Sequence, residues 1–213
     1  MNLYNKFNTV INSLGMQTLT HPLFYNSKIA IRFNIGDNGN EVYLEKKQRS
    51  FRVNPEYITV CFDRVQRIYN SLSTQPDVLV IDGFLDENEM IEEFVNSVMS
   101  ATDLPHPKEI KSEKYFIDDE ELMHVFLCWE LNDFNPDKLL REIISADLGG
   151  NNILTSSVYF VCSNDKVLFH LYDDRGADLC AEKTESILHI YNDLNEYILE
   201  YDRKRIDSIF KAE

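Results

Sequence analysis

Residues 158 to 181 read VYFVCSNDKVLFHLYDDRGADLCA, and in them three apolar runs are separated by two polar turns. The runs Val158–Cys162 and Val167–Tyr172 are rich in residues that favour strands, and Ser163-Asn164-Asp165 between them is typical of a tight turn. The second turn, Asp173–Gly176, leads into a third run near Ala177–Ala181. The segment therefore predicts a hairpin followed by a third short strand.

Apolar spacing predicts further strands upstream of this segment. Alternation of apolar and polar residues is typical of a strand with one buried face, and an unbroken apolar run is typical of a strand covered on both faces. Residues 29–35 and 123–131 alternate, residues 78–81 form an unbroken run, and a short strand at 42–44 is predicted to return from the polar turn at 36–40.

Helices are predicted where apolar residues recur every three or four positions. Asn54-Pro55 and Asn135-Pro136 each place a capping residue before a proline at the first helical position, and Asp86 with Glu89 resembles a capping box. The predicted helices cover residues 55–71, begin near Asp86, run from Asn135 to Gly149-Gly150, and begin again at Thr184.

Strands and helices follow one another without strict alternation, which favours an α+β fold. We predict one domain over residues 1–213, with a mixed or antiparallel sheet, helices mainly on one face and a long C-terminal helix. The YDDRG sequence falls in a C-terminal subregion at about 155–213. A hydrophobic content of 44% excludes a disordered chain, because that much apolar surface can offset the entropy of ordering.

The sequence carries no targeting, membrane or metal-binding signal. The N-terminal residues lack the basic and apolar segments of a signal peptide, and the apolar runs are far too short to span a membrane. The four cysteines are widely spaced and form no CxxC pair, so buried free thiols are expected. We predict a cytoplasmic protein with no metal and no cofactor, and the oligomeric state is not predicted.

Charge is distributed unevenly along the chain, whose formal net charge is -15. Residues 1–80 carry 9 Lys and Arg against 6 Asp and Glu, a net of +3, whereas residues 81–213 carry 12 against 30, a net of -18. Such a field disfavours nucleic acid and anionic membranes and attracts basic partners. The run Asp118, Asp119, Glu120 and Glu121 is either part of a solubilising surface or a contact site for a basic protein.

The motif Tyr172, Asp173, Asp174, Arg175 and Gly176 concentrates polar chemistry at a strand end. Neighbouring residues on an extended chain point to opposite faces, so the two aspartates do not form a proton-sharing pair unless the turn rotates them together. The simpler interpretation is a structural turn capped by Asp173 and closed by Gly176, whose backbone conformation a Cβ would strain. The alternative is a ligand or catalytic site in which Arg32 from another strand joins this cluster at one edge of the sheet.

The five histidines show no metal-binding spacing, and the chain contains none of the familiar nucleotide-binding or hydrolase motifs. His170 and Tyr172 share one face of their predicted strand, and His124 lies on the polar face of another. A cluster of these side chains would be a further candidate site.

The segment from Val167 to Leu179 resembles the hallmark of a bacterial family of unknown function that is known for its YDDRG motif. The segments 21–36 and 191–203 are similar to other parts of the same family, so that the resemblance covers nearly the whole chain; Ala177 is a minor departure. The resemblance implies a β-hairpin before the motif and a long helix after it. The family has no established activity, and therefore no functional residues are carried over from it.

Small acidic bacterial proteins of this kind are often immunity or antitoxin proteins. The resemblance and the charge together favour a non-enzymatic interaction protein that binds a basic partner. The alternative is an enzyme or small-ligand binder that uses the cluster of Asp173, Asp174 and Arg175.

Overall fold

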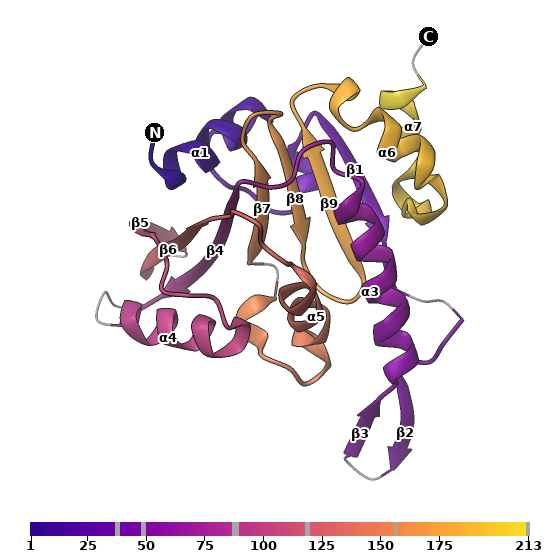
Figure 1. Cartoon of the computed structure of the whole chain (residues 1–213), viewed down its shortest axis with the longest axis horizontal. Helices are drawn as coiled ribbons and strands as arrows, with labels where there is room; N and C mark the ends of the chain where they lie inside the picture. The colour runs from indigo at the N-terminus through magenta and orange to yellow at the C-terminus, as the bar shows by residue number, and fades with distance from the viewer. Residues whose placement is uncertain (37–38, 48–49, 87–89, 118–119, 156, 212–213) are drawn as a thin grey trace.

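The computed structural model of the chain (Figure 1) describes residues 1–36, 39–47, 50–86, 90–117, 120–155 and 157–211. Its centre is a seven-stranded sheet in the order β1-β9-β8-β7-β4-β6-β5, and every neighbouring pair of strands is antiparallel. The strands of this sheet are β1 (Ile29–Asn34), β4 (Val78–Leu85), β5 (Glu109–Ile117), β6 (Glu120–Glu130), β7 (Val158–Cys162), β8 (Val167–Leu171) and β9 (Gly176–Ala181). The α+β class is confirmed, and of the two predicted sheet types the sheet is antiparallel.

The three runs between residues 158 and 181 form adjacent strands, as predicted. Tyr159 lies opposite His170 across β7 and β8, and His170 lies opposite Asp178 across β8 and β9. The apolar run at residues 78–81 lies within β4, which sits between β7 and β6, and all four residues of the run are buried.

Helices cover both faces of the sheet, and the two longest, α3 and α4, lie on the same face together with α5 (Figure 1). On that face, Tyr69 of α3 contacts Phe160 and Phe169. On the opposite face, Phe7 of α1 packs against Tyr159, with ring centroids 5.7 Å apart. The helices are α1 (Leu3–Ser13), α2 (Leu23–Asn26), α3 (Pro55–Asn70), α4 (Ile91–Thr102), α5 (Asp137–Ser145), α6 (Leu188–Asp193) and α7 (Arg203–Phe210).

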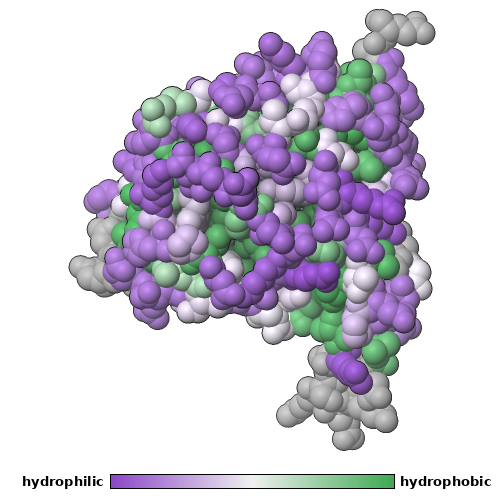
Figure 2. Space-filling view, in the orientation of Figure 1, coloured by the Kyte–Doolittle hydropathy of each residue, from purple (hydrophilic) through white to green (hydrophobic). Residues whose placement is uncertain are grey.

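The face covered by α3, α4 and α5 shows how the predicted helices pack. The side chain of Asn54 accepts a hydrogen bond from the backbone of Glu56, and Pro55 begins α3, as its sequence predicts. Gly83 leaves room for the ring of Phe94 from α4, because a Cβ there would lie 2.6 Å from that ring. Hydrophilic residues predominate on the outside of this layer, with hydrophobic residues visible between them (Figure 2).

Several elements differ from the sequence prediction. Helix α1 and the strands β3 (Ser50–Val53) and β5 were not predicted, although Leu3, Phe7 and Val10 in α1 show helical spacing. Strand β2 (Tyr43–Lys47) contains part of the short strand expected at 42–44, but it pairs with β3 in a separate two-stranded sheet instead of returning along β1. The predicted capping box of Asp86 and Glu89 includes residues 87–89, which lie outside the described residues.

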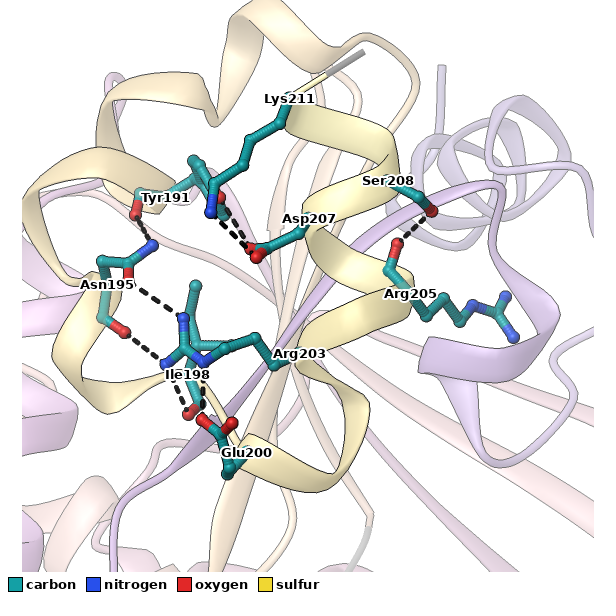
Figure 3. Close-up of polar contacts among 9 residues, drawn as sticks. All are labelled: Tyr191, Asn195, Ile198, Glu200, Arg203, Arg205, Asp207, Ser208 and Lys211. Atoms are coloured by element: carbon teal, nitrogen blue, oxygen red, sulfur yellow. Dashed lines mark hydrogen bonds and ion pairs between the residues drawn. The ribbon is translucent and has the colours of Figure 1, made fainter.

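The C-terminal segment ends in a helix, but it is not one continuous helix from Thr184. It is divided into α6 and α7, with short 3-10 turns before and between them, because Ile198 bridges to Phe33 and the amide of Leu199 donates to the carbonyl of Arg32. These contacts cover the outer edge of β1 and interrupt the helix. Arg203 stabilises the break by donating to the side-chain and backbone oxygens of Asn195 and to the carbonyl of Ile198 (Figure 3).

Candidate functional site

Two cavities lie on the sheet face that carries α1 and α2, and His21 from the loop between these helices lines both. The large cavity has a volume of about 610 Å³ and the small cavity one of about 320 Å³. The large cavity is lined by Tyr4, Asn8, Gln17, Thr18, Leu19, Thr20, His21, Asp82, Phe84, Glu113, Lys114, Tyr115, His124 and Phe126. The small cavity is lined by His21, Pro22, Arg32, His170, Tyr172 and Asp178.

A chain of hydrogen bonds forms the floor of the large cavity. Nε2 of His124 lies 2.6 Å from Oδ2 of Asp82, and the hydroxyl of Tyr159 donates to Oδ1 of Asp82 over 3.3 Å. The same hydroxyl lies 2.8 Å from Nε2 of His21. Asp82, His124 and Tyr159 are buried, and burial raises the pKa of Tyr159 well above its usual value. Burying polar groups is costly unless they form hydrogen bonds, and these groups form hydrogen bonds with one another.

Aromatic rings form one wall of the large cavity. The ring of His124 stacks on Phe84 at a centroid distance of 4.2 Å, because these residues lie opposite each other on β6 and β4. Phe84 also contacts Tyr115 of β5, at 5.1 Å. Phe84 and Tyr115 are 49% and 42% exposed, so a bound molecule could cover both rings. Exposed aromatic rings beside a few fixed polar groups are typical of small-molecule sites.

The rim of the large cavity carries charged groups that are already paired. Glu113 lies opposite His124 and accepts a 2.8 Å hydrogen bond from the hydroxyl of Tyr4; burial and this carboxylate raise the pKa of Tyr4. The ammonium group of Lys114 lies 2.7 Å from Glu121. The carboxylates of Asp82 and Glu113 therefore give the cavity a negative character.

The small cavity is built on an arginine–aspartate pair. Arg32 and Asp178 lie opposite each other on β1 and β9, and Arg32 donates to both carboxylate oxygens over 2.7 and 2.9 Å. The guanidinium also lies 4.9 Å from the ring centroid of Phe24 and 6.0 Å from that of Tyr172. Arg32 and Tyr172, both predicted site residues, thus share this cavity, but the charge of Arg32 is matched by Asp178.

Asp173, Asp174 and Arg175 of the YDDRG motif lie in the turn between β8 and β9 and do not join Arg32, and Gly176 begins β9. Oδ1 of Asp173 accepts a 2.8 Å hydrogen bond from the backbone of Arg175, and Oδ2 accepts one from Nε of Arg175. Asp173 is buried, whereas the side chain of Arg175 is 72% exposed and also lies 3.6 Å from Asp147. Both carboxylate oxygens of Asp173 therefore accept hydrogen bonds from within the turn.

Asp174 points to a different part of the structure from Asp173. Its Oδ2 accepts a 2.6 Å hydrogen bond from the hydroxyl of Tyr57, and its carbonyl accepts one from the thiol of Cys61, both on α3. Burial raises the pKa of Asp174, and the hydrogen bond from Tyr57 opposes this only in part. The carbonyl of Arg175 accepts a hydrogen bond from the backbone of Ile35. The turn thereby links β8, β9, the end of β1 and α3.

Gly176 is required for a reason other than the expected one. The glycines with positive φ in the described residues are Gly15 and Gly149, so the expectation of a strained backbone at Gly176 was wrong. A Cβ at Gly176 would instead collide with the hydroxyl of Tyr172 and lie 2.8 Å from the carbonyl oxygen of Phe33. Crowding by side chain and backbone excludes larger residues there.

The acidic run is only partly visible. Asp118 and Asp119 lie outside the described residues, Glu120 begins β6, and Glu121 is exposed beside Lys114.

The sequence predicted some of the polar side chains on the sheet face that lines the two cavities, but not all of them. His170 and Tyr172 do share a face, and His124 lies on that same face of the sheet. His21 and Tyr159 were missed because only the tertiary structure brings them together. Asp82 had a local signal, since it is a charged residue that directly follows the buried run 78–81. Among the described residues, no group of three or more His, Cys, Asp or Glu side chains could hold a metal ion.

A family model described as a domain of unknown function, DUF3885, matches residues 3–202. The chain belongs to the DUF3885 family. This match extends from α1 to Asp202 and includes every residue that lines the two cavities as well as the YDDRG turn.

The chain is also similar to a curated protein of unknown function. The chain is 24% identical over 204 residues to a Bacillus subtilis protein described as uncharacterized protein YnaE, and the alignment covers 84% of this chain and 91% of the relative. No solved structure matches the chain. Among the described helices of this DUF3885 member, none is long and apolar enough to cross a membrane.

Proposed function

We propose that this DUF3885 protein binds a small polar organic molecule in the large cavity. The observation that carries the proposal is the buried chain of His124, Asp82, Tyr159 and His21 along the floor of an aromatic-walled cavity of about 610 Å³. Cavities that bind small molecules fall in this size range and combine apolar walls with a few convergent polar groups.

The proposed site differs from the small-ligand site that the sequence suggested at Asp173, Asp174 and Arg175. Asp173 and Arg175 are bonded to each other, and Asp174 is bonded to α3. These contacts support an architectural role for the turn. Of the predicted cluster, Arg32 and Tyr172 remain near the proposed site, because they line the small cavity and His21 lines both cavities.

Binding can be tested by recording ¹H–¹⁵N NMR spectra of the full chain with a panel of amines, amino acids, nucleosides, sugars and carboxylic acids. We expect at least one class to shift the signals of residues around Asp82 and His124 at about 1 mM. Gln17→Trp, an exposed position that lines the large cavity, should abolish these shifts. Ser100→Trp, on α4 across the sheet, is the matched control and should leave them unchanged. A panel that shifts no cavity residue would contradict the proposal.

A second candidate is a non-enzymatic role in binding a basic protein, as an immunity or antitoxin protein does. It is favoured by the net charge of -18 on residues 81–213, which would attract a cationic partner. Glu92 and Glu93 in the first turn of α4 are both exposed.

The second candidate predicts recovery of a basic protein from a host lysate at low but not at high salt. The variant Glu92→Lys/Glu93→Lys should weaken that capture, whereas Gln17→Trp should not. Failure to recover any basic protein at low salt would argue against this candidate and leave the cavity proposal unaffected.

A further inference from the structure

The hydrogen-bond chain in the large cavity favours a proton on Nε2 of His21. The carboxylate of Asp82 can only accept, so the single hydroxyl hydrogen of Tyr159 is donated to it. With that hydrogen directed to Asp82, the oxygen of Tyr159 accepts from Nε2 of His21, over 2.8 Å. In a neutral imidazole that carries its proton on Nε2, the nitrogen Nδ1 holds a lone pair and can only accept.

The surroundings of His21 agree with a neutral ring. Desolvation lowers the pKa of His21, and the carboxylates of Asp82 and Asp178 raise it by less. No hydrogen-bond partner of Nδ1 is found in the part of the chain that the structure describes. His21 therefore offers a hydrogen-bond acceptor at Nδ1, and its ring lines both the large and the small cavity.

The other cavity groups restrict the chemistry of the ligand. Phe84 and Tyr115 offer exposed ring faces against which a flat molecule can stack. Asp82 and Glu113 add acceptors and negative charge, and the ammonium of Lys114 is engaged by Glu121. These features favour a flat ligand with N–H donors and disfavour a phosphorylated one.

We infer that the large cavity takes an unphosphorylated, amino-substituted aromatic heterocycle of the nucleobase or nucleoside class, with its ring against Phe84 and Tyr115 and an N–H donated to Nδ1 of His21. This inference rests on the proposed function, because it names the ligand of the same cavity. The volume of about 610 Å³ is sufficient for a nucleoside.

The first test measures the tautomer directly in two-bond ¹⁵N–¹H spectra of the full chain, with the His21 signals assigned by their loss in His21→Gln. We expect the Nε2–H form in the wild-type protein and a shift away from it in Tyr159→Phe, which removes the acceptor. His189 is the internal control, since its Nε2 lies 2.9 Å from the carbonyl of Ser71 and should keep its tautomer in both. A wild-type His21 in the Nδ1–H or the charged form would overturn the inference, whether or not Tyr159→Phe folds.

The second test titrates the chain with adenosine, cytidine, AMP and CMP and follows the NMR signals of cavity residues. We expect at least one nucleoside to bind, and its phosphorylated form to bind about tenfold more weakly. Tyr115→Ala should weaken nucleoside binding by about fivefold, the loss of one stacked ring. Phe116→Ala is the matched control, because Phe116 is exposed on the same strand but alternates to the other face.

The outcomes separate this inference from the proposed function. If no nucleoside binds while another class in the panel shifts cavity residues and is blocked by Gln17→Trp, the cavity is a ligand site and the inferred class is wrong. If nucleosides and their phosphates bind equally well, the charge argument fails and the inference is overturned. If nothing shifts a cavity residue, both proposals fail.

Discussion

The hydroxyl of Tyr57 donates a 2.6 Å hydrogen bond to Oδ2 of Asp174, and this buried contact joins α3 to the YDDRG turn across 117 positions of sequence. Neither partner is exposed, so water cannot replace the other if one is removed. The polar residue Asp174 at this strand end therefore connects secondary-structure elements.

Tyr57→Phe tests this contact, because it removes the donor and keeps the ring. We expect the free energy of unfolding to fall by about 1–3 kcal/mol, since a buried carboxylate loses a partner. Urea unfolding of wild type and variant gives the difference. Tyr201→Phe, at an 86% exposed position, should have almost no effect. Equal losses in the two variants would mean that the bond to Asp174 is not what stabilises the turn.

Asp174→Asn should change how stability depends on pH. Burial raises the pKa of Asp174 above its ordinary value of 3.8, and Tyr57 offsets this only in part. The folded protein then binds this proton more tightly than the unfolded chain does, so stability falls as pH rises from about 3.8 through the raised pKa. The asparagine keeps an acceptor for Tyr57 and does not ionise, so we expect this fall to disappear.

Urea unfolding at a series of pH values between about 3 and 8 measures the effect in wild type and Asp174→Asn. Asp193→Asn, at an exposed position, is the control and should follow the wild-type curve. Parallel curves for all three proteins would show that the charge of Asp174 does not affect folding.

Gly176→Ala should destabilise the protein through crowding. The added Cβ would collide with the hydroxyl of Tyr172 and lie 2.8 Å from the carbonyl oxygen of Phe33, which predicts a loss of about 1–3 kcal/mol. In a Tyr172→Ala background the loss should be smaller, because only the backbone contact remains. Thermal unfolding of the four proteins in this cycle measures the coupling, and strict additivity would show that Tyr172 is not the obstacle.

Asp173→Ala should cost more stability than Arg175→Ala. Asp173 is buried and caps the backbone of Arg175, so its loss should lower the free energy of unfolding by about 1 kcal/mol or more. Arg175 has a largely exposed side chain, and its truncation leaves that backbone hydrogen bond in place, so we expect a change of about 0.5 kcal/mol or less. Neither variant should alter ligand binding in the large cavity; loss of binding with unchanged stability would identify the turn as part of the site.

Local pattern was sufficient for most of the fold. Asn54-Pro55 placed the start of α3, and the runs at 158–162 and 167–172 placed two strands, because capping and strand periodicity depend on neighbours in sequence. Pattern was insufficient for the C-terminal segment, where the apolar stripe from Ile187 to Tyr201 fits one helix. The chain breaks there because Leu199 pairs with the edge of β1, a contact that no local periodicity encodes.

The candidate site was predictable only in fragments. The strand alternation that placed His170 with Tyr172 is local, and so is the position of Asp82 after a buried run. The hydrogen bond between His21 and Tyr159 joins residues 138 positions apart, and no spacing in the sequence indicates it.

The sequence by itself determined the α+β class, most of the strands, the acidic half of the chain and the turn at Asp173–Gly176. Each of these depends on residue type and on neighbours within a few positions. The tertiary structure decided the strand order, which side chains share a sheet face, and which polar groups are already satisfied. It paired Arg32 with Asp178 instead of Asp173, and it joined His21 to Tyr159 and Tyr159 to Asp82. Buried polar groups need hydrogen-bond partners, and packing decides which partners lie close enough.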